Sequence, residues 1–107
     1  MYLYTEPVTE KLVSRASENV FRDLGFGEEE AENLKIRSDL MIELTSLIEA
    51  QGLTQQAAAK LLGVTQPRIS DLMRGKIDRF SVDSLIEMLG HAGASVSVVV
   101  TRRSQVA

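Results

Sequence analysis

Two short helical stretches separated by one glycine constrain this chain most strongly. Thr54 can cap a helix that continues to Leu62, where Gly63 breaks it, and Thr65 can cap a further helix that ends before Gly75. Threonine hydroxyls accept hydrogen bonds from the free N–H groups at a helix start, whereas glycine adopts the left-handed conformation that often ends a helix. The sequence therefore predicts two helices over 55–62 and 66–73, joined by a tight turn.

The apolar residues of this pair fall where two crossing helices need them. Ala59 supplies a small side chain for the close approach of the two helices, and Gly63 tolerates a positive φ at the turn. The remaining apolar side chains of the shared core are Leu62, Val64, Ile69 and Leu72. The opposite face of the second helix is polar and can enter a DNA major groove. An αα-hairpin without any ligand is the alternative.

The rest of the chain predicts one mainly helical domain with extended ends. Its 107 residues, 44% of them hydrophobic, suffice for a single modest core. We expect further helices over 9–23, over 28–51 and over 82–91, the last capped by Ser81. Their expected core residues are Ala31, Leu34, Met41, Leu44, Leu47, Ile48, Leu85, Ile86, Met88 and Leu89.

Valines near the end of the chain predict a strand over 94–101, with Val96, Val98 and Val100 on one face. A lone strand in a helical domain leaves its backbone groups unpaired. Residues 1–5 of the same chain are one candidate partner. We favour the same strand of a second copy, because a two-fold pair suits DNA half-sites about one turn apart. These three valines then form the dimer interface.

Charge is distributed unevenly along the chain. The net charge is -3, but residues 1–50 hold 11 acids against 5 bases, while residues 51–79 hold 5 bases against 2 acids. The bases of the second segment are Lys60, Arg68, Arg74, Lys76 and Arg79. We therefore expect the segment 51–79 to meet an anion and the acidic segment 1–50 to meet something else, or to serve solubility alone.

The start of the second short helix carries residues suited to base edges in DNA. Thr65 at the N-cap leaves backbone N–H groups pointing outward. Gln66 can bind adenine through two hydrogen bonds, and Arg68 can bind guanine O6 and N7 in the same manner. Pro67 is tolerated in the first helical turn because its missing N–H has no partner there to lose. These residues favour DNA as the ligand.

The segment LTQQAAAKLLGVTQPRISDLMRGKIDRFSVDSLIEMLG resembles the helix-turn-helix of the Cro and phage-repressor superfamily, the XRE-like regulators. SENVFRDLG at 17–25, FS-x-x-x-L at 80–85 and the valine-rich end resemble the HigA-like antitoxins within it, so the likeness covers about 15–101. It implies a lambda-repressor-like helical bundle. It also implies a RelE-like or HigB-like ribonuclease toxin as a partner, although members of the subfamily occur without one.

The resemblance also implies a role for each matching residue. Gln55 contacts a phosphate and supports Gln66, and Lys76 and Arg79 contact phosphates beyond the second short helix. The full expected DNA-binding set is Gln55, Thr65, Gln66, Arg68, Ser70, Arg74, Lys76 and Arg79. Two residues depart from a DNA-binding pattern: Pro67 offers no side-chain contact, and Asp71 must turn away from the phosphates.

These observations predict a homodimeric repressor that binds a palindromic operator in double-stranded DNA, and an autoregulating antitoxin that neutralises a toxin. A stand-alone regulator without a toxin is the first alternative. A protein-interaction module, whose acidic first fifty residues bind a basic protein, is the second. We expect the domain to comprise an N-terminal arm and short helix at 1–27, the helix-turn-helix region at 28–93, and a strand and tail at 94–107.

Several classes of protein are disfavoured by what the sequence lacks. It has no cysteine and a single histidine, His91, so the familiar metal sites and cysteine nucleophiles have too few ligands. No nucleophile elbow or glycine-rich phosphate loop occurs. No window approaches the ~18 apolar residues of a membrane span, and the first residues do not resemble an export signal. We expect a cytoplasmic, nucleoid-associated protein that is not an enzyme, does not bind a membrane, and needs no cofactor or metal.

Overall fold

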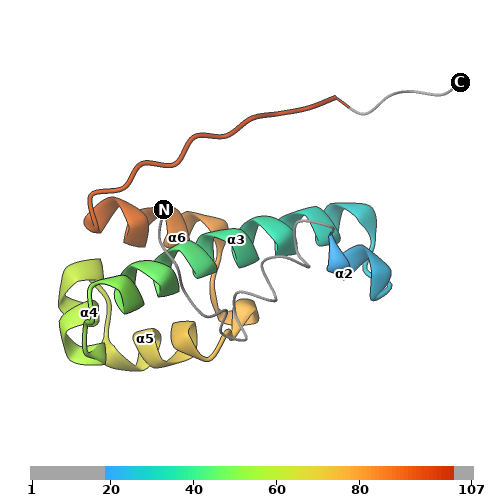
Figure 1. Ribbon diagram of the computed structural model, residues 1–107. Helices are drawn as coiled ribbons and strands as arrows, with labels where there is room; N and C mark the ends of the chain where they lie inside the picture. The colour runs from blue at the N-terminus through green and yellow to red at the C-terminus, as the bar shows by residue number, and fades with distance from the viewer. Residues whose placement is uncertain (1–18, 103–107) are drawn as a thin grey trace, which may run out of the picture.

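The computed structural model describes residues 19–102, which form a bundle of helices followed by an extended segment (Figure 1). The longest helix crosses the whole bundle; it contacts α6 on one side and α5 on another, and α4 packs against both α5 and α6. In chain order the elements are α2 (Val20–Asp23), α3 (Glu28–Ala50), α4 (Gln55–Leu62), α5 (Gln66–Met73), the 3-10 helix η1 (Ile77–Arg79) and α6 (Val82–His91).

The helix starts follow from local capping. The Thr54 hydroxyl accepts a hydrogen bond from the Ala57 N–H (3.1 Å) at the start of α4. At α6 the caps are reciprocal, because Ser81 Oγ accepts from the Ser84 N–H and Ser84 Oγ accepts from the Ser81 N–H, both at 3.1 Å. The predicted bounds of α4, α5 and α6 are confirmed, and α3 ends one residue earlier than expected.

The start of α5 differs from the prediction in one detail. Thr65 occupies the N-cap position, but its hydroxyl accepts no capping hydrogen bond. The reason is that Pro67, two residues on, has no N–H, while the Arg68 N–H donates to the Thr65 carbonyl (3.1 Å). The Thr65 side chain is therefore exposed and is not committed to the helix it precedes.

The main core lies where α3, α4, α5 and α6 meet. Leu44, Leu62, Ile69 and Leu85 are completely buried there, and Leu72 nearly so. Most of the predicted core residues are buried. Leu47 and Val64 are only half-buried. The prediction that Ile86 belongs to the core is wrong, because this side chain is 36% exposed. It lies one turn beyond Val82 on α6 and borders a hollow that faces the C-terminal segment.

A smaller apolar cluster joins α2 to the first turns of α3. Val20 and Phe21 pack against Ala31 and Leu34. The Phe21 ring also meets the edge of the Phe26 ring, with 6.3 Å between the centroids. The predicted helix over 9–23 is thus confirmed only from Val20, since its earlier part lies outside the described residues.

The predicted strand over 94–101 is not confirmed. No strand occurs between residues 19 and 102; the segment after α6 is extended and carries no backbone pairing. A strand is defined by the hydrogen bonds to its neighbour, and those residues of a single copy that are described offer it none. Val96 is half-buried against the core, whereas Val98 and Val100 are 75% and 85% exposed. The alternative partner, residues 1–5, lies outside the described residues.

Gly63, at the end of α4, is required for two separate reasons. Its φ of 70° lies in the left-handed region, which costs an L residue about 1–2 kcal/mol. In addition, ring atoms of His91 lie only 3.1–3.3 Å from where a Cβ on Gly63 would be. Gly75 has the same φ of 70° but nothing within 4 Å of such a Cβ. A comparison of Gly63 with Gly75 therefore separates the cost of the backbone conformation from the cost of a clash with His91.

Replacing each glycine by alanine tests this assignment. We expect Gly75→Ala to lower the free energy of unfolding by about 1–2 kcal/mol, the cost of the backbone conformation alone. Gly63→Ala should cost more, because the new methyl group also meets the His91 ring. Adding His91→Ala to Gly63→Ala should bring the loss back to that of Gly75→Ala. Urea unfolding followed by circular dichroism measures all three; equal losses for the two single variants contradict the steric part.

Candidate nucleic-acid interface

The outward face of α5 follows from the residues that it buries. Ile69 and Leu72 point into the core, so with 100° per residue the opposite side of the helix centres on Pro67 and Arg74, with Ser70 and Asp71 at its two edges. Pro67 and Arg74 are exposed and Ser70 is half-buried. The second helix of the pair thus presents a mainly polar side to solvent, as the sequence predicted.

The N-terminal ends of α4 and α5 lie next to an open hollow. Thr54, Lys60, Val64 and Gln66 are among the residues that line it. Gln55, Thr65 and Gln66 are all exposed, so the structure leaves these three predicted DNA contacts accessible. The predicted support of Gln66 by Gln55 stays a prediction.

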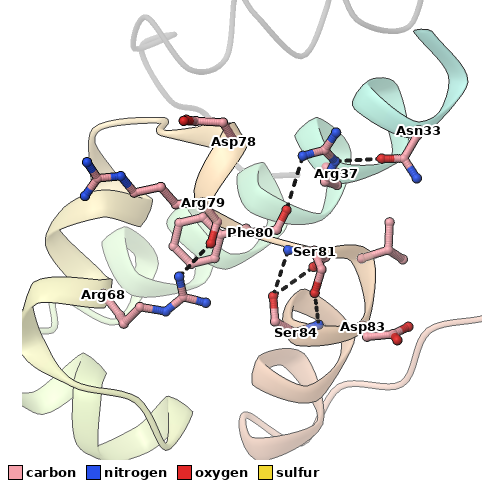
Figure 2. A pocket seen from close by; sticks show the side chains of 10 residues that line it. Asn33, Arg37, Arg68, Asp78, Arg79, Phe80, Ser81, Asp83 and Ser84 are labelled. Atoms are coloured by element: carbon pink, nitrogen blue, oxygen red, sulfur yellow. Dashed lines mark hydrogen bonds between the residues drawn. The ribbon is translucent and has the colours of Figure 1, made fainter. Parts of the chain in front are cut away.

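Arg68 lies on the flank of α5 that faces η1, not on its outermost side. Its Nη1 donates a hydrogen bond to the Arg79 carbonyl (2.6 Å), and its guanidinium carbon lies 4.2 Å from the centre of the Phe80 ring (Figure 2). Stacking and hydrogen bonding hold the half-buried guanidinium against the loop. The predicted contact with guanine stays a prediction, and it requires the guanidinium to leave both partners.

Asp71 is the acidic residue that has to avoid DNA, and it binds the two predicted phosphate ligands. Its carboxylate lies 3.2 Å from Arg79 Nη1 and 3.9 Å from Lys76 Nζ. Arg79 remains 54% exposed and Lys76 36%, whereas Asp71 is only 17% exposed. Both cations are therefore accessible to an anion, but each already has a carboxylate nearby.

Phe80 and Arg37 are important residues that the sequence analysis did not assign. Phe80 precedes the Ser81 cap and is 2% exposed, and with the buried Leu85 four residues into the helix it matches a hydrophobic staple. That local pattern could have identified Phe80. Arg37 gives no such signal, because the carbonyl groups that it binds, of Ile77 and Phe80, lie about forty residues further along the chain.

An open hollow of about 610 Å³ lies between α3, η1 and the start of α6 (Figure 2). Cations and acids share its wall, since Arg37, Arg68 and Arg79 line it together with Asp78 and Asp83. Because positive and negative side chains lie together in this wall, the hollow favours neither a small anion nor a small cation.

Residues 19–102 offer neither a membrane-spanning helix nor a cluster of metal ligands. None of the helices described there has both the length and the apolar character to cross a membrane. In the same part of the chain no three His, Cys, Asp or Glu side chains come together as metal ligands would.

Two known proteins that are similar to this chain are named as transcriptional regulators. A family model described as a helix-turn-helix domain matches residues 20–101. An uncharacterized HTH-type transcriptional regulator of Haemophilus influenzae is 30% identical over 84 residues, which cover 78% of this chain and 85% of that protein. A solved structure, named as a proposed XRE-family transcriptional regulator, has a TM-score of 0.65 and 34% identity over 73% of this chain and 90% of its own. The chain therefore belongs to the helix-turn-helix domain family, with residues 20–101 forming that domain.

Proposed function

We propose that this protein is a sequence-specific DNA-binding transcriptional regulator that represses by occupying a palindromic operator as a homodimer. The observation that carries the proposal is the exposed polar side of α5, held by a buried helix-turn-helix core and followed at once by basic residues. Both similar proteins are named as transcriptional regulators, one of them as a proposed member of the XRE family.

The proposed contacts divide into base edges and phosphates. Thr65 and Gln66 are exposed at the N-terminus of α5, and we assign them to base edges. Gln55, at the N-terminus of α4, is assigned to a phosphate. The remaining candidates at the end of α5 and in the following loop are Ser70, Arg74, Lys76 and Arg79. Arg68 stays a candidate for guanine under the condition given above.

Phosphate contacts explain how a protein of net charge -3 can bind DNA. Five of its bases and only two of its acids lie in residues 51–79, the part that contains α4, α5 and the following loop. Each phosphate that such bases neutralise releases condensed counterions, which favours association at low salt. The acids of α3 lie on a different element and need not approach the DNA.

The second copy is proposed to bind along the C-terminal segment and the hollow beside it. Ile36 and Ile86, 48% and 36% exposed, line this hollow of about 250 Å³ between α3, α6 and the segment. The extended segment 95–102 has backbone donors and acceptors without partners in the described part of its own chain. An identical segment running antiparallel pairs with those groups that lie along one edge of the segment and covers Val98 and Val100.

A second candidate function, neutralisation of a basic ribonuclease toxin, rests on the acidic side of α3. Glu29, Glu32 and Glu43 lie on one side of it; Ile36 and Asp39, between them, line the hollow proposed for the second copy, so the toxin and the second copy would meet neighbouring parts of α3. An acidic surface suits a protein that must itself hold an anionic RNA backbone. A stand-alone regulator lacks this partner, and an interaction module without DNA binding lacks the salt-dependent affinity for an operator.

The assigned DNA contacts predict two different kinds of loss. Gln66→Ala should cost about 1–3 kcal/mol of binding and relax the preference at one base pair per half-site. Lys76→Ala should weaken binding to all sequences alike and lower the slope of affinity against salt by about one. Lys35→Ala removes a base from α3 and serves as the control with little effect. Binding-site selection and anisotropy titrations over a salt series distinguish these outcomes; an unchanged base preference for Gln66→Ala contradicts its role.

A charge in the row of valines tests the dimer. Val98→Asp should shift the protein to monomers and lower its affinity for a full operator, because a carboxylate would be buried between the two segments. Thr101→Asp adds the same charge to the opposite face of the segment, away from the hollow, and should remain a dimer. Sedimentation over a range of concentrations measures both variants. If Val98→Asp stays dimeric with wild-type affinity for the operator, the interface lies elsewhere.

Charge reversal on α3 tests the second candidate function. The partner to try is a small basic protein encoded next to this chain. Glu29→Lys with Glu43→Lys should abolish co-purification and toxin neutralisation but leave operator binding intact. Glu49→Lys with Glu87→Lys reverses two exposed acids elsewhere and should leave co-purification and toxin neutralisation unchanged. Deleting residues 1–27 is a less clean test, because it removes Val20 and Phe21 from their contacts with α3. Neutralisation by the first variant excludes this surface as the toxin contact.

A further inference from the structure

The loop between α5 and α6 is held by an arginine from outside the helix-turn-helix pair. Arg37, in the middle of α3, donates from Nη1 to the carbonyl oxygens of Ile77 (3.1 Å) and Phe80 (3.3 Å). Its Nε donates to Asn33 Oδ1 (2.7 Å), one turn earlier on the same helix. Figure 2 shows Arg37 between Asn33 and the loop. The guanidinium therefore has a fixed plane and a fixed set of acceptors.

The loop has little regular structure of its own. Its backbone hydrogen bonds are local: the Lys76 N–H donates to Asp71 O in α5, the Ile77 N–H to Gly75 O, the Arg79 N–H to Lys76 O and the Phe80 N–H to Ile77 O. From α5, Arg68 Nη1 donates a hydrogen bond to the Arg79 carbonyl oxygen (2.6 Å). Carbonyl groups of the loop thus accept hydrogen bonds from cations on two different helices, and these long-range bonds act together with the buried Phe80 ring to fix its place in the fold.

The same loop carries the two side chains proposed to contact phosphates beyond α5. Lys76 precedes η1 and Arg79 ends it, and both side chains extend into solvent. Their reach toward a phosphate depends on where the backbone of the loop lies relative to α5. We propose that Arg37 is a positioning residue for DNA binding, which holds the loop so that Lys76 and Arg79 meet the phosphate backbone when α5 lies in the groove; this rests on the proposed function.

Two observations favour positioning over a direct phosphate contact by Arg37. Its Nε and Nη1 already donate to three acceptors of the protein itself. The hollow beside it also contains Asp78 and Asp83, whose carboxylates repel an anion. An arginine suits this place because its planar group can donate several hydrogen bonds in fixed directions, which a lysine ammonium cannot reproduce.

The test uses Arg37→Met in the full-length protein, with Lys35→Met as the matched control. Lys35 lies two residues away on α3, so about 200° around the helix, and pairs with Asp39 at 2.8 Å, so its replacement removes an equal charge without touching the loop. The first measurement is the rate of tryptic cleavage after Lys76 and Arg79 without DNA. We expect Arg37→Met to be cleaved several-fold faster than Lys35→Met, because cleavage requires the loop to open.

The second measurement is the slope of operator affinity against salt. Arg37→Met should lower this slope by about one for each phosphate that the protein no longer neutralises, uniformly over DNA sequences, and adding Lys76→Ala should then lower it less than in the wild type. A direct contact by Arg37 predicts additive decreases in the slope. Arg37→Lys keeps the charge but should behave as Arg37→Met does, and it replaces that variant if Arg37→Met does not fold.

The outcomes separate this inference from the function on which it rests. Faster cleavage with a lower, non-additive slope supports positioning. Faster cleavage with an unchanged slope, unchanged cleavage, or additive decreases in the slope overturns it. If the wild-type protein shows no salt-dependent binding to any operator, the proposed function fails and the positioning role fails with it, while the cleavage rates still report whether Arg37 holds the loop.

Discussion

The burial of Phe80 joins α5 and α6, which flank it in the sequence, to the distant α3. Its ring is 2% exposed in the main core, where it matches a hydrophobic staple with Leu85 of α6. The guanidinium of Arg68, from α5, covers the ring, and the Phe80 carbonyl accepts a hydrogen bond from Arg37 of α3. Removing this ring would leave a cavity and take away the contacts with Arg68 and Leu85, whereas the backbone carbonyl that Arg37 binds would remain. The relative placement of α5 and the loop therefore depends on an apolar side chain that needs no contact with DNA.

The parts of the fold that the sequence predicted are those with local causes. Thr54 and Ser81 cap helices within three residues of themselves, and Gly63 ends one through its own backbone conformation. Helical spacing of apolar residues then identifies which sides are buried, so Ile69 and Leu72 could be assigned to the core from the sequence alone. The residues of α5 that are not buried must form its solvent-exposed side. This is why the sequence could predict which side of α5 belongs to the candidate interface.

The parts that the sequence did not predict depend on distant partners. A strand over 94–101 needs a neighbour to pair with. The β-branched residues of this segment show only that it suits a strand, and do not identify the neighbour. The position of the Arg68 guanidinium depends on Phe80 and on a carbonyl eleven residues away. For Arg37 the partners are forty and forty-three residues away. No helical period or capping pattern in the sequence indicates such contacts. The position of an arginine on its own helix therefore does not reveal which residues it binds.

The pairing of Asp71 with Lys76 and Arg79 bears on how an acidic protein distinguishes its operator from other DNA. Asp71 is only 17% exposed, but Lys76 and Arg79 are 36% and 54% exposed, so a phosphate can reach both cations while they stay close to the carboxylate. With Asp71 present, however, the three side chains together carry a charge of +1 instead of +2. That lowers the sequence-independent part of the affinity, which comes from phosphate contacts. A weaker non-specific term leaves a larger share of the binding energy to base contacts at the start of α5, and so raises the ratio of specific to non-specific binding.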